Sequence, residues 1–340
     1  MFARSRTAFD SASKVQIAGG DFLASLADAP VWVTLAAPLG STDEHRMSWR
    51  AWITFAVLCI LWGVPYFFIK VALQELSPAC VAWTRIALAA LILLPIAWKR
   101  GVLGPVMKHK GAVIGFAVAE LVFPFFLIAW GEQYVSSSFA GILVATVPLT
   151  VVLIAPMMGL HERLGPKRIA GLAVGFSGVI ALLGLDTGHG PMLWAGVAAI
   201  GVAVVGYAVG PLVVQRYLAD VDELGALALS LVVATIILAP MALLSAPSQL
   251  PTMIPLVSVI VLGVFCTALA LLLYFYLIND AGAARASLVA YVCPAVAALL
   301  GVLVLHERFG VSSTVGLVMI LFGSWLASSK PRVSEAPATA

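Results

Sequence analysis

Charged side chains are scarce in this chain. Asp, Glu, Lys and Arg together make up 10% of the 340 residues, whereas hydrophobic residues make up 62% and the mean hydropathy is +1.07. Soluble proteins carry about 25% charged and roughly 45–50% apolar residues. The composition therefore excludes soluble enzymes, secreted disulfide scaffolds and nucleic-acid-binding modules. The 19 basic and 16 acidic residues are also too balanced to indicate a polyanionic partner, so we expect no binding of nucleic acid.

Motifs that hold metals, phosphates or redox centres are missing as well. The four cysteines lie singly within apolar runs, and His161 and His306 have no metal-ligand neighbours at a useful spacing. There is no GxxxxGK[ST] loop to bind ATP. No nucleophile has a plausible base. We therefore expect no cofactor, no metal and no enzymatic activity.

Long apolar runs dominate the chain instead. Backbone polar groups find no partner in hydrocarbon, so each membrane crossing must be a helix of roughly 20 apolar residues. Ten such segments run approximately over 52–73, 78–98, 111–131, 137–159, 168–184, 192–214, 224–246, 254–278, 284–305 and 311–328. The pattern predicts an all-α integral membrane protein with ten transmembrane helices and the lipid bilayer as its surroundings.

Lysine and arginine are distributed unevenly between the two sides of these segments. With the N-terminus inside, and leaving aside Arg85 within a helix and the three basic residues Arg4, Arg6 and Lys14 near the N-terminus, 13 fall on the inner side and only Lys70 and Arg308 on the outer side. The cytoplasmic side of a membrane protein retains positive charge. The bias predicts that both termini are cytoplasmic in a multi-pass protein of the bacterial inner membrane.

Both ends of the chain lie outside the ten segments. Residues 1–46 contain several acidic residues and only a short apolar run, so we expect a disordered N-terminal extension rather than a secretory signal. Met47 is an alternative natural start, and the sequence does not decide between Met1 and Met47. Residues 329–340 are expected to form a cytoplasmic tail.

An internal repeat divides the ten segments into two sets of five. Residues 160–165 (LHERLG) recur as residues 305–310 (LHERFG), and at matching offsets Gly171 answers Gly316 and Gly178 answers Gly323. Because five is an odd number, the second copy enters the membrane from the opposite face. The halves 52–184 and 192–328 are thus predicted to be inverted repeats, an architecture typical of secondary transporters, although channels also use it.

Several motifs resemble one transporter family. Residues 61–70 (LWGVPYFFIK), followed by Pro78 and Arg85, resemble the opening of an EamA-type member of the drug/metabolite transporter superfamily. Residues 148–162 and 294–307, each with a proline and a terminal glutamate, are similar to the fourth and ninth helices of that family. Residues 262–264 with Thr267 are similar to its eighth helix. The resemblance implies a ten-helix carrier that moves a small organic metabolite, amino-acid-like or drug-like, across the bacterial cytoplasmic membrane, most often outward.

Two ionisable residues fall inside predicted membrane helices, where charge is costly. Arg85 lies about 10 Å from the outer end of the second helix, and Glu120 lies about 14 Å from the inner end of the third, at 1.5 Å per residue. One interpretation is a fixed buried ion pair, or separate snorkelling. The other is that Glu120 couples solute exchange to protons, while Arg85 binds a solute carboxylate or tunes Glu120. Glu120 departs from the family pattern.

Polar-tipped aromatic residues and a threonine complete the predicted substrate site. Rings of this kind can line cavities for amphiphilic solutes, although an aromatic residue in a membrane helix usually serves as packing or as an interfacial anchor. With Arg85 and Glu120, the predicted substrate-binding residues are Trp62, Tyr66, Tyr207, Thr267, Tyr274 and Tyr291.

Gate and hinge positions are predicted from repeat symmetry and from charge near the helix ends. Lys70 is a candidate outer gate, with snorkelling as the alternative. Pro148 and Pro294 occupy equivalent positions of the two halves and are hinge candidates. Glu162 and Glu307 each precede a helix and are expected to stabilise its N-terminus. A passive channel, a sensor and an assembly subunit remain alternative functions, and monomer or homodimer stays open.

Overall fold

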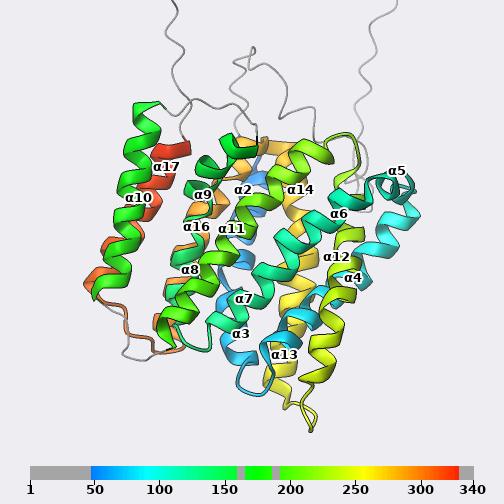
Figure 1. Ribbon diagram of the computed structural model, residues 1–340, viewed down its shortest axis with the longest axis horizontal. Helices are drawn as coiled ribbons and strands as arrows, with labels where there is room; N and C mark the ends of the chain where they lie inside the picture. The colour runs from blue at the N-terminus through cyan, green and yellow to red at the C-terminus, as the bar shows by residue number, and fades with distance from the viewer. Residues whose placement is uncertain (1–46, 159–164, 186–191, 329–340) are drawn as a thin grey trace, which may run out of the picture. The chain divides into compact units, whose positions relative to one another are not determined.

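The computed structural model describes residues 47–158, 165–185 and 192–328, and these residues form helices and no strand (Figure 1). The predicted extension 1–46 and tail 329–340 lie outside the described residues. Local sequence signals start several of the helices. At four of them a polar side chain accepts a hydrogen bond from a backbone N–H of the first turn, which satisfies one donor that the helix cannot pair itself. These caps are Ser48, Ser77, Ser136 and Asp222.

The helices group into ten spans, numbered here in chain order. Span 1 comprises α2 (Trp49–Gly63) and α3 (Pro65–Ala72), and span 2 is α4 (Pro78–Lys99). Span 3 comprises α5 (Leu103–Val106), η1 (Met107–His109), α6 (Lys110–Phe116), η2 (Ala117–Val122) and α7 (Phe123–Gly131). Span 4 comprises α8 (Ser137–Val144), α9 (Val147–Ile154) and η3 (Ala155–Met158), and span 5 is α10 (Pro166–Leu185). Span 6 is α11 (Leu193–Tyr217), and span 7 is α12 (Glu223–Leu244). Span 8 comprises α13 (Met253–Gly263), η4 (Val264–Leu269) and α14 (Ala270–Ala281). Span 9 comprises α15 (Ala283–Ala286) and α16 (Val289–Leu303), and span 10 is α17 (Val311–Ser328).

The ten predicted apolar segments are confirmed, with three differences in detail. Nine helices of the described chain are long and apolar enough to cross a membrane, but α16 in span 9 has only 15 residues. Span 3 starts earlier than expected, at Leu103. Span 1 is interrupted at Val64, because Pro65 has no N–H to continue the hydrogen-bond ladder and begins a new helix.

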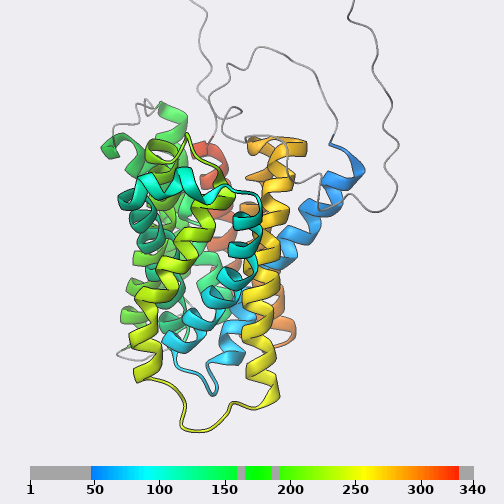
Figure 2. The ribbon, with the colours of Figure 1, turned by 90° about the vertical axis from the view of Figure 1, so that its right-hand side faces the viewer.

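The packing of the spans follows an inverted two-fold arrangement. Spans 2 and 7, 4 and 9, and 5 and 10 pack against each other, and each of these pairs joins equivalent helices of the two halves. Span 1 packs on span 8, and the equivalent pair, span 6 on span 3, is also formed. These main packing pairs thus map onto one another when the halves are exchanged. Figures 1 and 2 show the bundle that they form from two directions. The two inverted five-helix repeats predicted from the sequence are confirmed.

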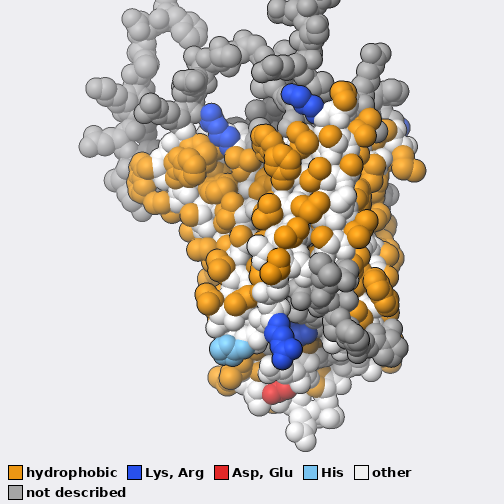
Figure 3. Space-filling view, turned by 90° about the vertical axis from the view of Figure 1, so that its left-hand side faces the viewer, with side chains coloured by type: hydrophobic (Ala, Val, Ile, Leu, Met, Phe, Trp, Pro, Cys, Tyr) orange, Lys and Arg blue, Asp and Glu red, His pale blue; other side chains and the backbone are white. Residues whose placement is uncertain are grey.

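The helix bundle has two opposite faces and an apolar side wall. We call the end at which α2 begins and α17 ends the terminal face, and the end at which α3 ends and α13 begins the distal face; they are at the top and bottom of Figure 1. Hydrophobic side chains cover the wall between them, with Lys and Arg toward its two margins (Figure 3). Such a surface suits hydrocarbon between two aqueous layers, and the protein is a multi-pass membrane protein.

Glycines of α10 and α17 let the two halves approach each other closely. An added Cβ on Gly323 would lie 2.4 Å from the backbone nitrogen of Gly175 and 2.6 Å from the carbonyl oxygen of Gly171. Small residues let membrane helices approach in this way. This contact accounts for the small residues Gly171, Gly175 and Gly178 on α10.

Gly323→Ala is therefore expected to destabilise the bundle. The new methyl group would meet backbone atoms, which cannot rotate away, and overpacking of this kind costs about 1–3 kcal/mol. Thermal unfolding of the purified protein in detergent measures the effect. Gly201→Ala is the matched control, because a Cβ there meets no atom within 4 Å. Equal melting temperatures for both variants would contradict the prediction.

Candidate functional site

Two π-helical turns lie at equivalent places in the two halves. Glu120 is the fourth residue of η2 in span 3, and Thr267 is the fourth residue of η4 in span 8. Pro124 has no N–H to bond the carbonyl of Glu120, which accounts for the irregular turn in span 3. In span 8 the hydroxyl of Thr267 donates to the carbonyl of Leu262 at 2.8 Å. Because π-turns concentrate at functional sites, the pair marks a candidate site at the centre of the bundle.

Arg85 joins α4 to the second of these turns. Its Nε donates to Oγ1 of Thr267 at 2.8 Å, and its guanidinium carbon lies 4.0 Å from the ring centroid of Phe125. The side chain is only 8% exposed, and no carboxylate of the described chain lies within 4.0 Å of it. The structure thus contains a buried guanidinium with a hydroxyl and an aromatic ring as neighbours.

The ion pair between Arg85 and Glu120, one of the two interpretations of the sequence, is not formed. A Cβ on Gly263 would lie 3.0 Å from the carbonyl oxygen of Arg85, so this glycine lets α13 approach α4 closely and brings the guanidinium to η4. Glu120 points elsewhere, onto α11. Its Oε2 is buried without a hydrogen-bond partner, and a Cβ on Gly210 would lie 2.0 Å from that atom.

Gly210→Ala is expected to displace the Glu120 carboxyl and to lower thermal stability by about 1–3 kcal/mol. The loss should be smaller in a Glu120→Ala background, because the carboxyl that the new methyl group would meet is then absent. A double-mutant cycle of thermal unfolding gives the coupling, and contacting residues show interaction energies of about 0.5–3 kcal/mol. Additive effects of the two substitutions would show that the contact with Gly210 does not hold the carboxyl in place.

Two predicted tyrosines lie around this centre. The rings of Tyr207 and Phe125 are 6.4 Å apart in an edge-on arrangement, and Tyr207 is in electrostatic range of both Arg85 and Glu120. Tyr66 is in electrostatic range of Arg85 and packs on Gly141, whose added Cβ would lie 3.3 Å from the ring. The structure therefore brings together five of the predicted residues, which we call the central cluster: Tyr66, Arg85, Glu120, Tyr207 and Thr267.

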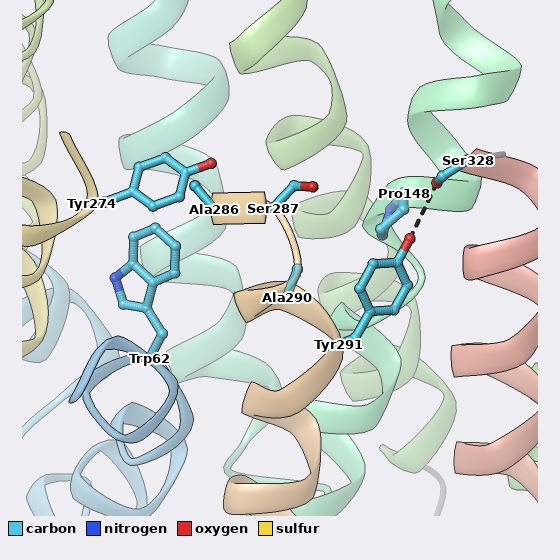
Figure 4. A pocket seen from close by; sticks show the side chains of 8 residues that line it. All are labelled: Trp62, Pro148, Tyr274, Ala286, Ser287, Ala290, Tyr291 and Ser328. Atoms are coloured by element: carbon cyan, nitrogen blue, oxygen red, sulfur yellow. Dashed lines mark hydrogen bonds between the residues drawn. The ribbon is translucent and has the colours of Figure 1, made fainter. Parts of the chain in front are cut away.

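The remaining predicted aromatics line a pocket between the two halves (Figure 4). The rings of Trp62 and Tyr274 are 4.8 Å apart, and the hydroxyl of Tyr291 donates to Oγ of Ser328 at 3.2 Å. The full lining is Trp62, Pro148, Tyr274, Ala286, Ser287, Ala290, Tyr291 and Ser328. Trp62 and Pro148 come from the first half and the others from the second. Since Ser328 ends α17, the pocket lies toward the terminal face.

The two hinge candidates differ in their local structure. In span 4 the helix is interrupted at Ala145 and Thr146, α9 begins at Val147, and Pro148 lies in its first turn. In span 9, α16 continues through Pro294, and the interruption falls earlier, between α15 and α16. The repeat therefore conserves the position of each proline but not the way the helix accommodates it.

Lys70 lies at the distal face and is hydrogen-bonded to the backbone. Its Nζ donates to the carbonyl oxygens of Glu132 and Val135, which follow α7; the second bond is 2.9 Å long. A cation at this place also interacts favourably with the C-terminal end of the helix dipole. The ammonium group thus joins α3 to the segment after α7.

Glu307 caps a helix, but not the one expected. The sequence suggested the helix that follows it, α17; instead its carboxylate accepts hydrogen bonds from the backbone N–H groups of Ser137 and Ser138, at 2.7 and 3.0 Å, and from Oγ of Ser138 at 2.6 Å. These residues begin α8, in the other half. The reason is that α8 presents the unpaired N–H groups of its first turn to the segment that follows α16. Its sequence counterpart, Glu162, lies outside the described residues.

Glu75 also caps a helix of the other half, but here the carboxylate belongs to the first half and the helix to the second. Its carboxylate, from the first half, accepts hydrogen bonds at 2.6 Å from both N and Oγ1 of Thr252, the N-cap of α13 in the second half. These bonds, from the hydroxyl and from the backbone, lower the pKa of the exposed Glu75 carboxyl below its ordinary value. The cap is therefore formed at neutral pH and is lost as pH falls through that lowered pKa. Two carboxylates thus join the halves at the distal face.

Comparison with known proteins identifies the family. Residues 49–184 and 194–329 match the EamA-like transporter family, one match in each half. Protein PagO of Salmonella typhimurium is 27% identical over 281 residues, covering 81% of this chain and 91% of the relative. YedA of Escherichia coli (strain K12), named an uncharacterized inner membrane transporter, is 28% identical over 288 residues and 82% and 92% of the two chains. A solved crystal structure at 21% identity superposes with a TM-score of 0.58, over 82% of this chain and 96% of the solved one, and has the same fold. The chain belongs to the EamA-like transporter family.

Proposed function

We propose that the protein is a secondary transporter that exports a small organic metabolite across the bacterial cytoplasmic membrane by alternating access. The observation that carries this proposal is the pocket between two inverted halves toward the terminal face, together with the carboxylate caps that join the same halves at the distal face. Two inverted halves can exchange conformations, which closes one side as the other opens. The arrangement fits a state that is accessible from the terminal face.

The terminal face is the cytoplasmic face in this proposal. Of the lysines and arginines in the described chain, nine lie at the helix ends and connections of the terminal face, whereas Lys70 and Arg308 lie at the distal face. The nine are Arg50, Lys99, Arg100, Lys108, Lys110, Lys167, Arg168, Arg216 and Arg285. Retention of positive charge inside supports this orientation, with both termini in the cytoplasm. The inner-membrane name of YedA supports the same membrane.

Arg85 is the residue that we assign to solute recognition. A buried guanidinium that pairs with no carboxylate of the described residues favours an anionic ligand, and a planar guanidinium holds a carboxylate with two parallel hydrogen bonds. The solute in this proposal therefore carries a carboxylate, as an amino-acid-like metabolite does. Tyr66, Tyr207 and Thr267 surround the bound solute, and Trp62, Tyr274 and Tyr291 line its entry from the terminal face.

Glu120 is the candidate for proton coupling in the central cluster. Its Oε2 has no hydrogen-bond partner, so a bound proton removes the cost of burying a charge at this place. Lys70 acts as a gate at the distal face, and Pro148 and Pro294 act as hinges in spans 4 and 9. The two domains that move are the predicted halves 52–184 and 192–328, a division supported by the two family matches.

Excretion by a producing host tests the proposal and identifies the solute. We would overproduce the protein in a bacterial host and compare the small molecules released by wild type, Glu120→Gln and empty vector at matched membrane levels. The wild type is expected to release a defined class of carboxylate-bearing metabolites, and Glu120→Gln to release less. Equal release by wild type and Glu120→Gln would agree with export but would show that proton coupling does not depend on Glu120.

Counterflow in proteoliposomes then separates a carrier from the other functions. A carrier exchanges labelled solute faster when unlabelled solute is present on the opposite side, because its binding site then returns across the membrane with solute bound. Flux without this acceleration would identify a passive channel. Absence of solute flux would favour a sensor or an assembly subunit.

A further inference from the structure

Besides Glu120, a second glutamate has buried carboxyl oxygens without hydrogen-bond partners, and this one, Glu132, lies at the distal face. Glu132 follows the last residue of α7, its side chain is 0% exposed, and both of its carboxyl oxygens are buried without a hydrogen-bond partner. The Oγ of Ser137, at the start of α8, is also buried without a partner. An unpaired carboxylate in such a place costs several kcal/mol, and the C-terminal end of α7 adds the negative end of a helix dipole.

The charged and titratable groups around Glu132 do not neutralise it in this conformation. Lys70 on α3 is in electrostatic range, but its ammonium donates to the backbone carbonyls of Glu132 and Val135, and no ion pair with the carboxylate is formed in the described chain. Arg85 on α4 is in range but bonds Thr267. Tyr66 on α3 is in electrostatic range as well, and α11 places the apolar Ile200 against the adjacent Gly131.

The fourth neighbour has the same sign of charge as an ionised Glu132. The carboxylate of Glu307, from the segment after α16, is in electrostatic range of Glu132 while it caps α8. Two carboxylates that interact electrostatically in a buried site oppose each other's ionisation. Because Glu307 accepts three hydrogen bonds and Glu132 accepts none, the proton belongs on Glu132 as long as the distal face is closed.

We propose that Glu132 is a proton-binding site of the distal gate, occupied while the distal face is closed. This inference rests on the alternating access of the proposed function and adds a proton site distinct from Glu120. When the distal face opens, water reaches Glu132, its O–H bond breaks, and the proton passes to water on that side. The resulting carboxylate pairs with the Lys70 ammonium, which leaves the two carbonyls. Reclosure requires a proton to be taken up from the distal side.

Infrared spectroscopy of the purified protein tests the protonation state directly and needs no knowledge of the solute. The difference spectrum between wild type and Glu132→Gln at neutral pH is expected to contain a band in the protonated-carboxyl region. Glu120→Gln is the matched control, because Glu120 is the other described glutamate with an unpaired buried oxygen, and its removal must leave the Glu132 band in place. A difference spectrum with only ionised-carboxylate bands would overturn the proposal.

A distance measurement tests the link to the gate. Spin labels at Gln133→Cys and Arg308→Cys, both exposed and in opposite halves, report on the distal face, and the four native cysteines are buried. Raising the pH is expected to increase the population with a long distance in wild type and not in Glu132→Gln. The same measurement on Glu307→Gln shows whether any part of the pH-dependent change in distance comes from the Glu307 carboxylate.

Failure of the Glu132 assignment can be distinguished from failure of the alternating access on which it rests. A response to pH that persists unchanged in Glu132→Gln would overturn the assignment to Glu132 and leave alternating access standing. A distance that never changes, at any pH or in any variant, would overturn the opening of the distal face on which both proposals rest.

Discussion

Replacing Arg85 with methionine is expected to lower the rate of solute exchange, at subsaturating solute, by about 10- to 100-fold. Hydrogen bonds to charged groups contribute about 1.5–3 kcal/mol, and each 1.4 kcal/mol is a factor of about ten. Methionine keeps an unbranched apolar stem against Phe125 but offers no donor to a solute carboxylate or to Thr267. Initial rates of counterflow in proteoliposomes, at equal amounts of reconstituted protein, give the measurement.

Conservative variants separate recognition by Arg85 from a purely structural role. Arg85→Lys keeps the charge but loses the planar fork, so we expect it to bind the solute weakly and to fold normally. Thr267→Ser keeps the hydroxyl that accepts from Arg85, whereas Thr267→Val loses it at nearly the same volume. Serine should retain more exchange than valine. Full exchange by Arg85→Met, at normal protein levels, would exclude the guanidinium from solute binding.

The helices and their inverted arrangement could be predicted because the bilayer constrains the sequence strongly. Each crossing must satisfy its own backbone hydrogen bonds, so it appears as a long apolar run. The repeated LHER segment then revealed an odd number of helices in each half. Local departures from regular helix were harder to predict. Pro124 signals a break in span 3, but η4 contains no proline, and its irregular turn coincides with the hydrogen bonds that Thr267 makes to Arg85 and to the carbonyl of Leu262.

The site could be predicted only in part, because sequence gives the depth of a side chain in a helix but not the direction in which the packed helix points it. Arg85 and Glu120 were singled out by the cost of burying charge. Their depths suggested a pair, yet Arg85 turns to η4 and Glu120 turns to Gly210 on α11. Gly210 carried no signal of its own, since glycine is common throughout the chain.

Glu132 and the caps at the distal face escaped prediction for a related reason. A glutamate one residue beyond an apolar run is ordinarily read as an exposed helix end, and only the tertiary structure buries it beneath Lys70. Glu307 was expected to serve the nearest helix along the chain. The helix terminus nearest in space belongs to the other half, and repeat symmetry alone does not show which termini meet.

Gly301→Ala is expected to shift the distal face toward its open state. An added Cβ on Gly301 would lie 2.0 Å from Oγ of Ser138 and 2.3 Å from Oε2 of Glu307, so the cap on α8 could not form as it does in the native chain. Loss of one hydrogen bond to a charged group changes the balance of closed and open states by about 1.5–3 kcal/mol, or roughly 10- to 100-fold. The label pair at Gln133 and Arg308 measures the two populations.

Two further variants make this expectation specific to the cap. Glu307→Gln leaves the glycine intact but removes the charge from the same three hydrogen bonds, so it should shift the populations in the same direction as Gly301→Ala. Gly201→Ala adds a methyl group to a transmembrane helix at a place with no atom within 4 Å and should leave the populations unchanged. If Gly301→Ala and Glu307→Gln both kept the native distance, the carboxylate cap would be a packing feature of α8, and closure of the distal face would depend on Lys70 and on the Glu75 cap at α13.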